Sequence, residues 1–170
     1  GISGVFVAMI VAPSVPNLLR GVVQFYGAFS SEADVQAMEW LRANTPEDAR
    51  ILNYSQPHEA DWAPLISGRD TVYYRPQPFF VGDEASLAEQ ERLRAFWQDP
   101  ANPDNESLLR DAGISFVLLP QIVGNPDAFS SMWRWRDPFI EPATSQIEDA
   151  PYLTEVFDAE GARVYQLTDE

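Results

Sequence analysis

The sequence of 170 residues predicts an α/β domain with a mostly parallel central sheet. Helical and strand patterns alternate along the chain, which favours parallel strands joined by helices. Residues 114–120 (ISFVLLP) are apolar apart from Ser115, which is typical of a strand that is covered on both faces. Residues 152–167 form two alternating segments around the turn DAEG, which predicts an antiparallel hairpin at one edge of the sheet.

The first helix of this domain is predicted over residues 30–49. Ser31 and Asp34 match the S-x-x-D capping box that begins many helices. Pro46 ends the helical pattern, because the residue before a proline is forced out of helical backbone space. The apolar face of the helix is formed by Val35, Ala37, Met38, Trp40 and Leu41.

The middle of the chain alternates strands and helices. Short strands are predicted at residues 50–54 and 70–75, where β-branched and aromatic residues gather. Helices are predicted at residues 83–98 and 106–113, and residues 126–151 look loop-rich with one or two helical turns. The core candidates of the longer helix are Leu87, Leu93, Phe96 and Trp97. With the closing hairpin, this order predicts a Rossmann-like domain of three layers.

The composition excludes several classes of protein. The formal net charge is −15 and the pI is about 4.2, so electrostatic repulsion makes nucleic-acid binding unexpected. The chain has no cysteine, which excludes disulfides and thiolate metal sites. Hydrophobic residues make up 45% of the chain and aromatic residues 12%, which predicts a folded core and not a disordered segment.

An uncharged apolar stretch opens the sequence. Residues 1–12 contain no charged side chain, and no initiator methionine precedes them. The stretch could be a buried core element, a signal peptide, or the end of a transmembrane helix that begins upstream. The absence of a basic residue before Arg20 argues against a signal peptide. Phe25, Tyr26 and Phe29 are types that settle at a membrane interface, so the membrane helix is favoured.

This interpretation divides the chain in two. Residues 1–28 are predicted to be the end of a transmembrane helix with its juxtamembrane segment, and residues 29–170 a soluble α/β domain. The acidic domain carries no positive-inside signal, which favours the extracytoplasmic face of the membrane.

One short segment combines aromatic rings with guanidinium groups. Trp62, Arg69, Tyr73 and Arg75 lie close together in the sequence, from the loop after the first strand into the second strand. Aromatic faces stack on sugars and arginine forks hold phosphates, so these four residues are the predicted substrate-binding site. In the alternative interpretation the aromatic residues belong to the core and Arg69 pairs with one of the many acidic residues.

Two other segments are weaker candidates. His58, the single histidine, lies beside Glu59 and Asp61, a pattern that could suit a metal ion or a general base. It matches no zinc-ligand spacing, so we interpret it as a solvated loop. Residues 132–136 (MWRWR) alternate aromatic and basic side chains, which suits either a lipid or partner contact or a loop held by buried indoles.

No nucleophile elbow, phosphate loop or paired-histidine motif occurs, so no catalytic residue, metal or cofactor is predicted.

Four stretches together resemble a known kind of domain: DVQAMEWLRANTPEDARIL, W…SGR, LLRDAGISFVLLP and YLTEVFDAEGARVYQL. They are similar to the extracytoplasmic C-terminal domains of polytopic bacterial membrane proteins of the GT-C glycosyltransferase type, including dolichyl-phosphate-mannose-mannosyltransferase-like and YfhO-like proteins. The matching places are Trp40 to Pro46, Gly113 to Leu119, and Val156 to Leu167.

The resemblance implies a parent enzyme in the bacterial cell membrane that transfers sugar from a polyprenyl-phosphate donor. The acidic catalytic residue of such enzymes lies in an early extracytoplasmic loop, and no residue of this chain matches its motif. The chain is therefore expected to be an accessory or acceptor-side domain that is inactive alone. Its expected partners are the upstream transmembrane domain and a polyprenyl-phosphate sugar or glycan acceptor.

Two other functions remain open at this point. The chain could be a non-catalytic interaction module of a polytopic membrane protein, binding a partner in the cell envelope. It could also be a free-standing soluble α/β enzyme whose first residues only look membranous. Apolar spans of about 20 residues upstream in the reading frame would support a membrane origin and exclude the free-standing enzyme.

Overall fold

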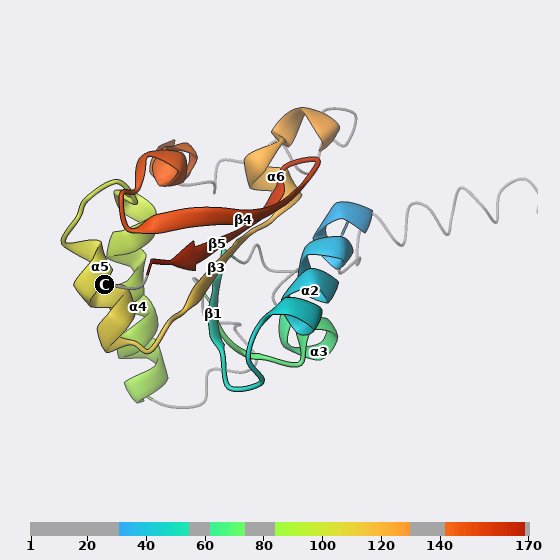
Figure 1. Cartoon of the computed structure of the whole chain (residues 1–170). Coiled ribbons are helices and arrows are strands. Elements are labelled where there is room, and N and C mark those ends of the chain that lie inside the picture. Colours follow the sequence, from blue (N-terminus) through green and yellow to red (C-terminus); the bar gives the residue numbers. More distant parts are fainter. Residues whose placement is uncertain (1–30, 55–61, 74–83, 130–141, 169–170) are drawn as a thin grey trace, which may run out of the picture.

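A five-stranded mixed sheet forms the centre of the domain (Figure 1). The computed structural model describes residues 31–54, 62–73, 84–129 and 142–168. In sheet order the strands are β2 (Asp70–Tyr73), β1 (Arg50–Asn53), β3 (Phe116–Leu119), β5 (Ala162–Leu167) and β4 (Leu153–Ala159). Strand β1 is parallel to β2 and β3, whereas β5 is antiparallel to both β3 and β4. The predicted parallel sheet with an antiparallel edge hairpin is confirmed.

Helices cover both faces of this sheet. Helices α2 (Glu32–Asn44) and α3 (Ala63–Ser67) pack on one face (Figure 1). Helices α4 (Glu84–Gln98) and α5 (Asn105–Asp111) pack on the other, together with the 3-10 helix η3 (Pro142–Asp149). Across the sheet, the connection from β1 to β2 runs toward one edge, and the connection from β2 to β3 runs back past β1 in the opposite direction. Connections between parallel strands are almost always right-handed, so the helices of these two connections lie on opposite faces of the sheet. The three predicted layers result.

Two apolar clusters fill the spaces between the layers. Side chains alternate along each strand, so neighbouring residues enter different clusters. Ile51 packs toward α2 with Met38 and Leu41, whereas Leu52 packs toward α4 with Phe96 and Trp97. The core candidates Leu93, Phe96 and Trp97 are buried as predicted, and the side chain of Leu87 lies outside the described residues.

The buried carboxylate of Asp34 ties two distant segments together. The predicted capping box is present: the Ser31 hydroxyl accepts from the backbone N–H of Asp34, and Asp34 Oδ2 accepts from the backbone N–H of Ser31. Asp34 Oδ1 accepts a third hydrogen bond, 2.7 Å long, from the backbone N–H of Gln121 at the start of the short helix α6 (Gln121–Gly124). Burial raises the pKa of Asp34 above its ordinary 3.8 and outweighs these hydrogen bonds, which lower it.

This raised pKa predicts a specific pH dependence of stability. Between pH 3.8 and the folded-state pKa, the native protein binds more protons at Asp34 than the unfolded chain does. The contribution of Asp34 to stability therefore rises as the pH falls through the folded-state pKa. We expect the free energy of unfolding of wild type, relative to Asp34→Asn, to increase on acidification. Urea denaturation of both proteins across this pH range measures it, and a decrease would contradict the raised pKa.

The hairpin turn is a two-residue connection between β4 and β5. Ala159 pairs with Ala162, and both intervening residues have positive φ: 52° at Glu160 and 98° at Gly161. This combination matches the type I′ turn, whose twist fits antiparallel strands. The predicted DAEG turn is confirmed. Gly161 also lies against Gly124 at the end of α6, leaving no room for a side chain at either position.

Some predicted elements differ in extent. The first helix ends at Asn44, because Thr45 takes an extended conformation before Pro46. Helices α3 and α6 were not predicted, and residues 126–129 and 142–149 form 3-10 helices in the segment expected to be loop-rich. The predicted membrane segment, residues 1–28, lies outside the described residues. No helix in the described ranges is long and apolar enough to cross a membrane.

Candidate functional site

The carboxyl ends of β1 and β2 form the switch point of the sheet. Asn53 and Tyr73 are register partners at these ends. From here the chain continues to α3 on one face and to α4 on the other. In open α/β sheets ligands bind at such a point, where connections diverge to opposite faces.

A buried polar residue, Asn53, lies at this switch point. Only 1% of Asn53 is exposed, and strand alternation places its side chain on the α2 and α3 face, like that of Ile51. Its Nδ2 group has no hydrogen-bond partner among the described residues. A buried donor without an acceptor costs about 1–3 kcal/mol, so Asn53 is suited to bind an acceptor atom from outside these residues. Sequence reasoning did not select Asn53, although a polar residue directly after the apolar pair Ile51 and Leu52 was the available signal.

Trp62 lies just before α3 and is accessible. Its exposed fraction is 36%, and that of Leu65, one turn further along, is 71%. Helix α3 has Pro64 in its first turn and ends at Gly68, whose φ of 66° is the left-handed conformation that closes helices. The helix therefore presents an indole and a leucine to solvent.

Arg69 lies at the opposite end of α3 and has a structural role. Its guanidinium donates to the backbone oxygens of Arg42 (2.8 Å) and Thr45 (2.9 Å) and to the Thr45 hydroxyl (3.0 Å). These oxygens belong to the carboxyl end of α2, where a cation satisfies free carbonyls and the helix dipole. Arg69 lies at the amino edge of the sheet, away from the carboxyl ends of β1 and β2, because α3 returns the chain to that edge before β2 begins.

The other predicted site residues are only partly described. Tyr73 ends β2 at the switch point, and its side chain lies outside the described residues. Arg75, His58 with Glu59 and Asp61, and residues 132–136 also lie outside them. The structure thus brings Asn53 and the end of β2 together, separates Arg69 from them, and leaves substrate binding by Trp62, Arg69, Tyr73 and Arg75 a prediction.

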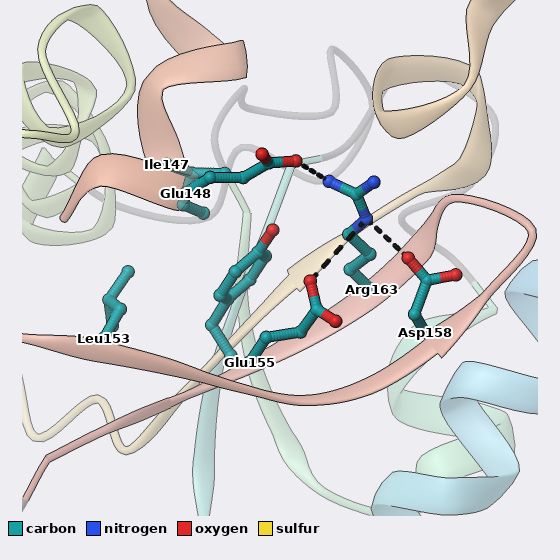
Figure 2. Close-up of a pocket in the computed structure, with 7 residues that line it drawn as sticks. Ile147, Glu148, Leu153, Glu155, Asp158 and Arg163 are labelled. Atoms are coloured by element: carbon teal, nitrogen blue, oxygen red, sulfur yellow. Dashed lines mark hydrogen bonds and ion pairs between the residues drawn. The ribbon is translucent and has the colours of Figure 1, made fainter.

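A polar pocket of about 380 Å³ opens between the β4–β5 hairpin and η3 (Figure 2). It belongs to the face of the sheet that carries α4 and α5, away from α3. Its lining combines two aliphatic residues, three acids, one arginine and one tyrosine: Ile147, Glu148, Leu153, Glu155, Asp158, Arg163 and Tyr165.

Arg163 is surrounded by the three carboxylates of this pocket, as Figure 2 shows. Its Nε lies 2.6 Å from Asp158 and 3.8 Å from Glu155, and its Nη1 pairs with Glu148. One positive charge among three negative charges leaves the pocket with a net negative charge. These ion pairs hold the carboxylates in place around the opening.

The hydroxyl of Tyr165 is the unusual group of this pocket. The residue is 2% exposed, and its Oη has no hydrogen-bond partner among the described residues. Burial raises the pKa of the phenol, while the nearby Arg163 guanidinium lowers it. A guanidinium has no acceptor, so it cannot accept the phenolic hydrogen. Sequence reasoning did not select this site. Its residues come from η3, β4 and β5, and only the folded structure brings these three elements together.

The fold has a counterpart among solved structures. The chain is similar to the C-terminal globular domain of oligosaccharyltransferase from Archaeoglobus fulgidus, with a TM-score of 0.53 and 10% sequence identity. The similarity covers 82% of this chain and 100% of that domain. No protein-family model matches the sequence, and the comparison with curated proteins finds no relative. At this identity the likeness shows a shared fold: the chain has the architecture of that globular domain.

Proposed function

We propose that this chain is the extracytoplasmic domain of an integral membrane glycosyltransferase-like protein in the bacterial cell membrane, which uses a polyprenyl-phosphate sugar. The observation that carries the proposal is the fold shared with the C-terminal globular domain of an oligosaccharyltransferase. The sequence resemblance to GT-C-type extracytoplasmic domains supports the same origin.

The domain's role is accessory or acceptor-side. Within the described ranges, no group of His, Cys, Asp or Glu side chains could hold a metal ion. The sequence also has no nucleophile elbow and no phosphate loop. The chemistry that the site offers is binding: an accessible indole at Trp62 and a buried amide donor at Asn53, both on the α3 face.

Trp62 is the residue we propose to contact the sugar. Aromatic rings bind the C–H face of a sugar, and a buried amide donates to one of its oxygens. Tyr73, the last residue of β2, and Arg75, which follows it in the sequence, keep their predicted part in substrate binding. Arg69 contributes indirectly, by fixing α3 against the end of α2.

Replacing Trp62 with alanine is expected to weaken binding of a short-chain polyprenyl-phosphate sugar by about 1–3 kcal/mol, the scale of one stacking contact with its burial. Isothermal titration of the chain measures the loss. Leu65→Ala is the matched control, because it removes a more exposed apolar side chain from the same helix. Wild-type affinity in Trp62→Ala would refute the sugar contact.

The second candidate function is a non-catalytic interaction module, and the exposure of Leu65 favours it. Trp62 and Leu65 together give α3 an apolar surface of the kind used in protein contacts. A partner protein, such as the transmembrane part of the same chain, would bury both residues. Equal loss of association in Trp62→Ala and Leu65→Ala would support this function, whereas loss in Trp62→Ala alone would support the sugar site.

A further inference from the structure

The pocket between the β4–β5 hairpin and η3 contains several hydrogen-bond acceptors and one donor that lacks an acceptor among the described residues. The carboxylates of Glu148, Glu155 and Asp158 are acceptors, and they surround the guanidinium of Arg163. The buried hydroxyl of Tyr165 supplies a donor that no described residue satisfies. A ligand that completes this set must donate to carboxylates and also accept from a phenol.

The net charge of the pocket restricts the ligand further. Three carboxylates against one guanidinium repel phosphate and other anions. An ammonium or guanidinium ligand would suit the carboxylates, but it has only donors and would leave the Tyr165 hydroxyl unsatisfied. A metal ion has no suitable cluster among the described residues.

The remaining surface of the pocket is aliphatic. Ile147 and Leu153 line it beside the charged groups. The volume of about 380 Å³ falls at the lower end of the range of about 300–1,000 Å³ that small-molecule sites occupy. An occupant therefore has one apolar face and an edge of polar groups.

We propose that this pocket binds a neutral saccharide. Sugar hydroxyls both donate and accept, so one ring can donate to the carboxylates and accept from Tyr165. The C–H face of the ring would rest on Ile147 and Leu153. This site is separate from the proposed Trp62 site, because the two lie on opposite faces of the sheet.

Tyr165→Phe tests the proposal, because it removes only the hydroxyl that no described residue satisfies. The probes are the uncharged methyl glycosides of glucose, mannose, galactose and N-acetylglucosamine, titrated into the chain by NMR. We expect saturable binding of at least one probe, and about three- to tenfold weaker binding to Tyr165→Phe, the worth of one neutral hydrogen bond. Without ligand, this variant is expected to melt at the wild-type temperature or above, since the phenolic hydrogen has no acceptor among the described residues.

Tyr152→Phe is the matched control. The Tyr152 hydroxyl is also buried, but it donates to the backbone oxygen of Pro100. Its removal is expected to lower the melting temperature and to leave saccharide binding unchanged. The titration follows the amide signals of β5 for this pocket and those of α3 for the Trp62 site separately, so the failure of one site is distinguishable from the failure of the other.

Three results would overturn the proposal. The first is that none of the four glycosides binds saturably. The second is that Tyr165→Phe binds them as tightly as wild type does. The third is that methylammonium binds in the pocket more tightly than any glycoside and is insensitive to Tyr165→Phe, which would identify a cation site.

Discussion

Gly124→Ala is expected to destabilise the domain by about 2–4 kcal/mol, because the added methyl group has no space. A Cβ at this position would lie 2.0 Å from the backbone oxygen of Gly161 and 3.0 Å from its carbonyl carbon. Both neighbours are backbone atoms of a tight turn, so neither can rotate away as a side chain would. The turn must separate from α6 to admit the methyl group.

Helix propensity alone would predict that Gly124→Ala stabilises the domain. Gly124 is the last residue of α6, and alanine is the better helix former by about 1 kcal/mol. Gly113→Ala is the control: Gly113 has a φ of 69° but no atom within 4 Å of an added Cβ. It should lose only about 1–2 kcal/mol through backbone strain. Urea denaturation of both variants measures the difference, and a Gly124→Ala protein as stable as wild type would disprove the close contact.

Asp34→Ala is expected to lower the free energy of unfolding by about 2–4 kcal/mol. The substitution removes part of a helix cap and leaves a buried backbone N–H without its acceptor. Without the carboxylate, the N–H of Ser31 loses its acceptor. The N–H of Gln121 also loses its acceptor in a buried position. The second loss is the larger, because water cannot replace the carboxylate there.

Ser31→Ala separates the two contributions. It removes the hydroxyl that accepts from the Asp34 N–H and leaves the bond to Gln121 in place. The expected cost is about 1 kcal/mol, the usual worth of a helix cap. Equilibrium unfolding of both variants provides the comparison. If Asp34→Ala were no less stable than Ser31→Ala, the connection between α2 and α6 would contribute nothing.

Elements with strong local patterns could be predicted from the sequence. The capping box located the start of α2, the apolar run located β3, and the DAEG turn located the hairpin. Helices α3 and α6 were missed because they have five and four residues, too few for a helical periodicity to show.

The candidate sites were harder to predict, because they depend on contacts between distant segments. Arg69 follows Trp62 closely in the sequence, yet the carbonyls at the end of α2 hold it at the other edge of the sheet. Asn53 and Tyr165 are ordinary strand residues in the sequence. Their significance lies in buried groups without partners among the described residues, which no local pattern encodes.

The position of β5 inside the sheet has a consequence for synthesis of the protein. Although β5 comes last of the five strands in the chain, it lies between β3 and β4. Until residue 167 has been made, one edge of β3, with the sequence FVLL, lacks its antiparallel neighbour. An apolar strand with a free edge is a template for pairing with other chains. The free edge of β3 therefore carries a risk of aggregation until β5 emerges, and a chaperone that shields residues 116–119 would protect the growing polypeptide at that stage.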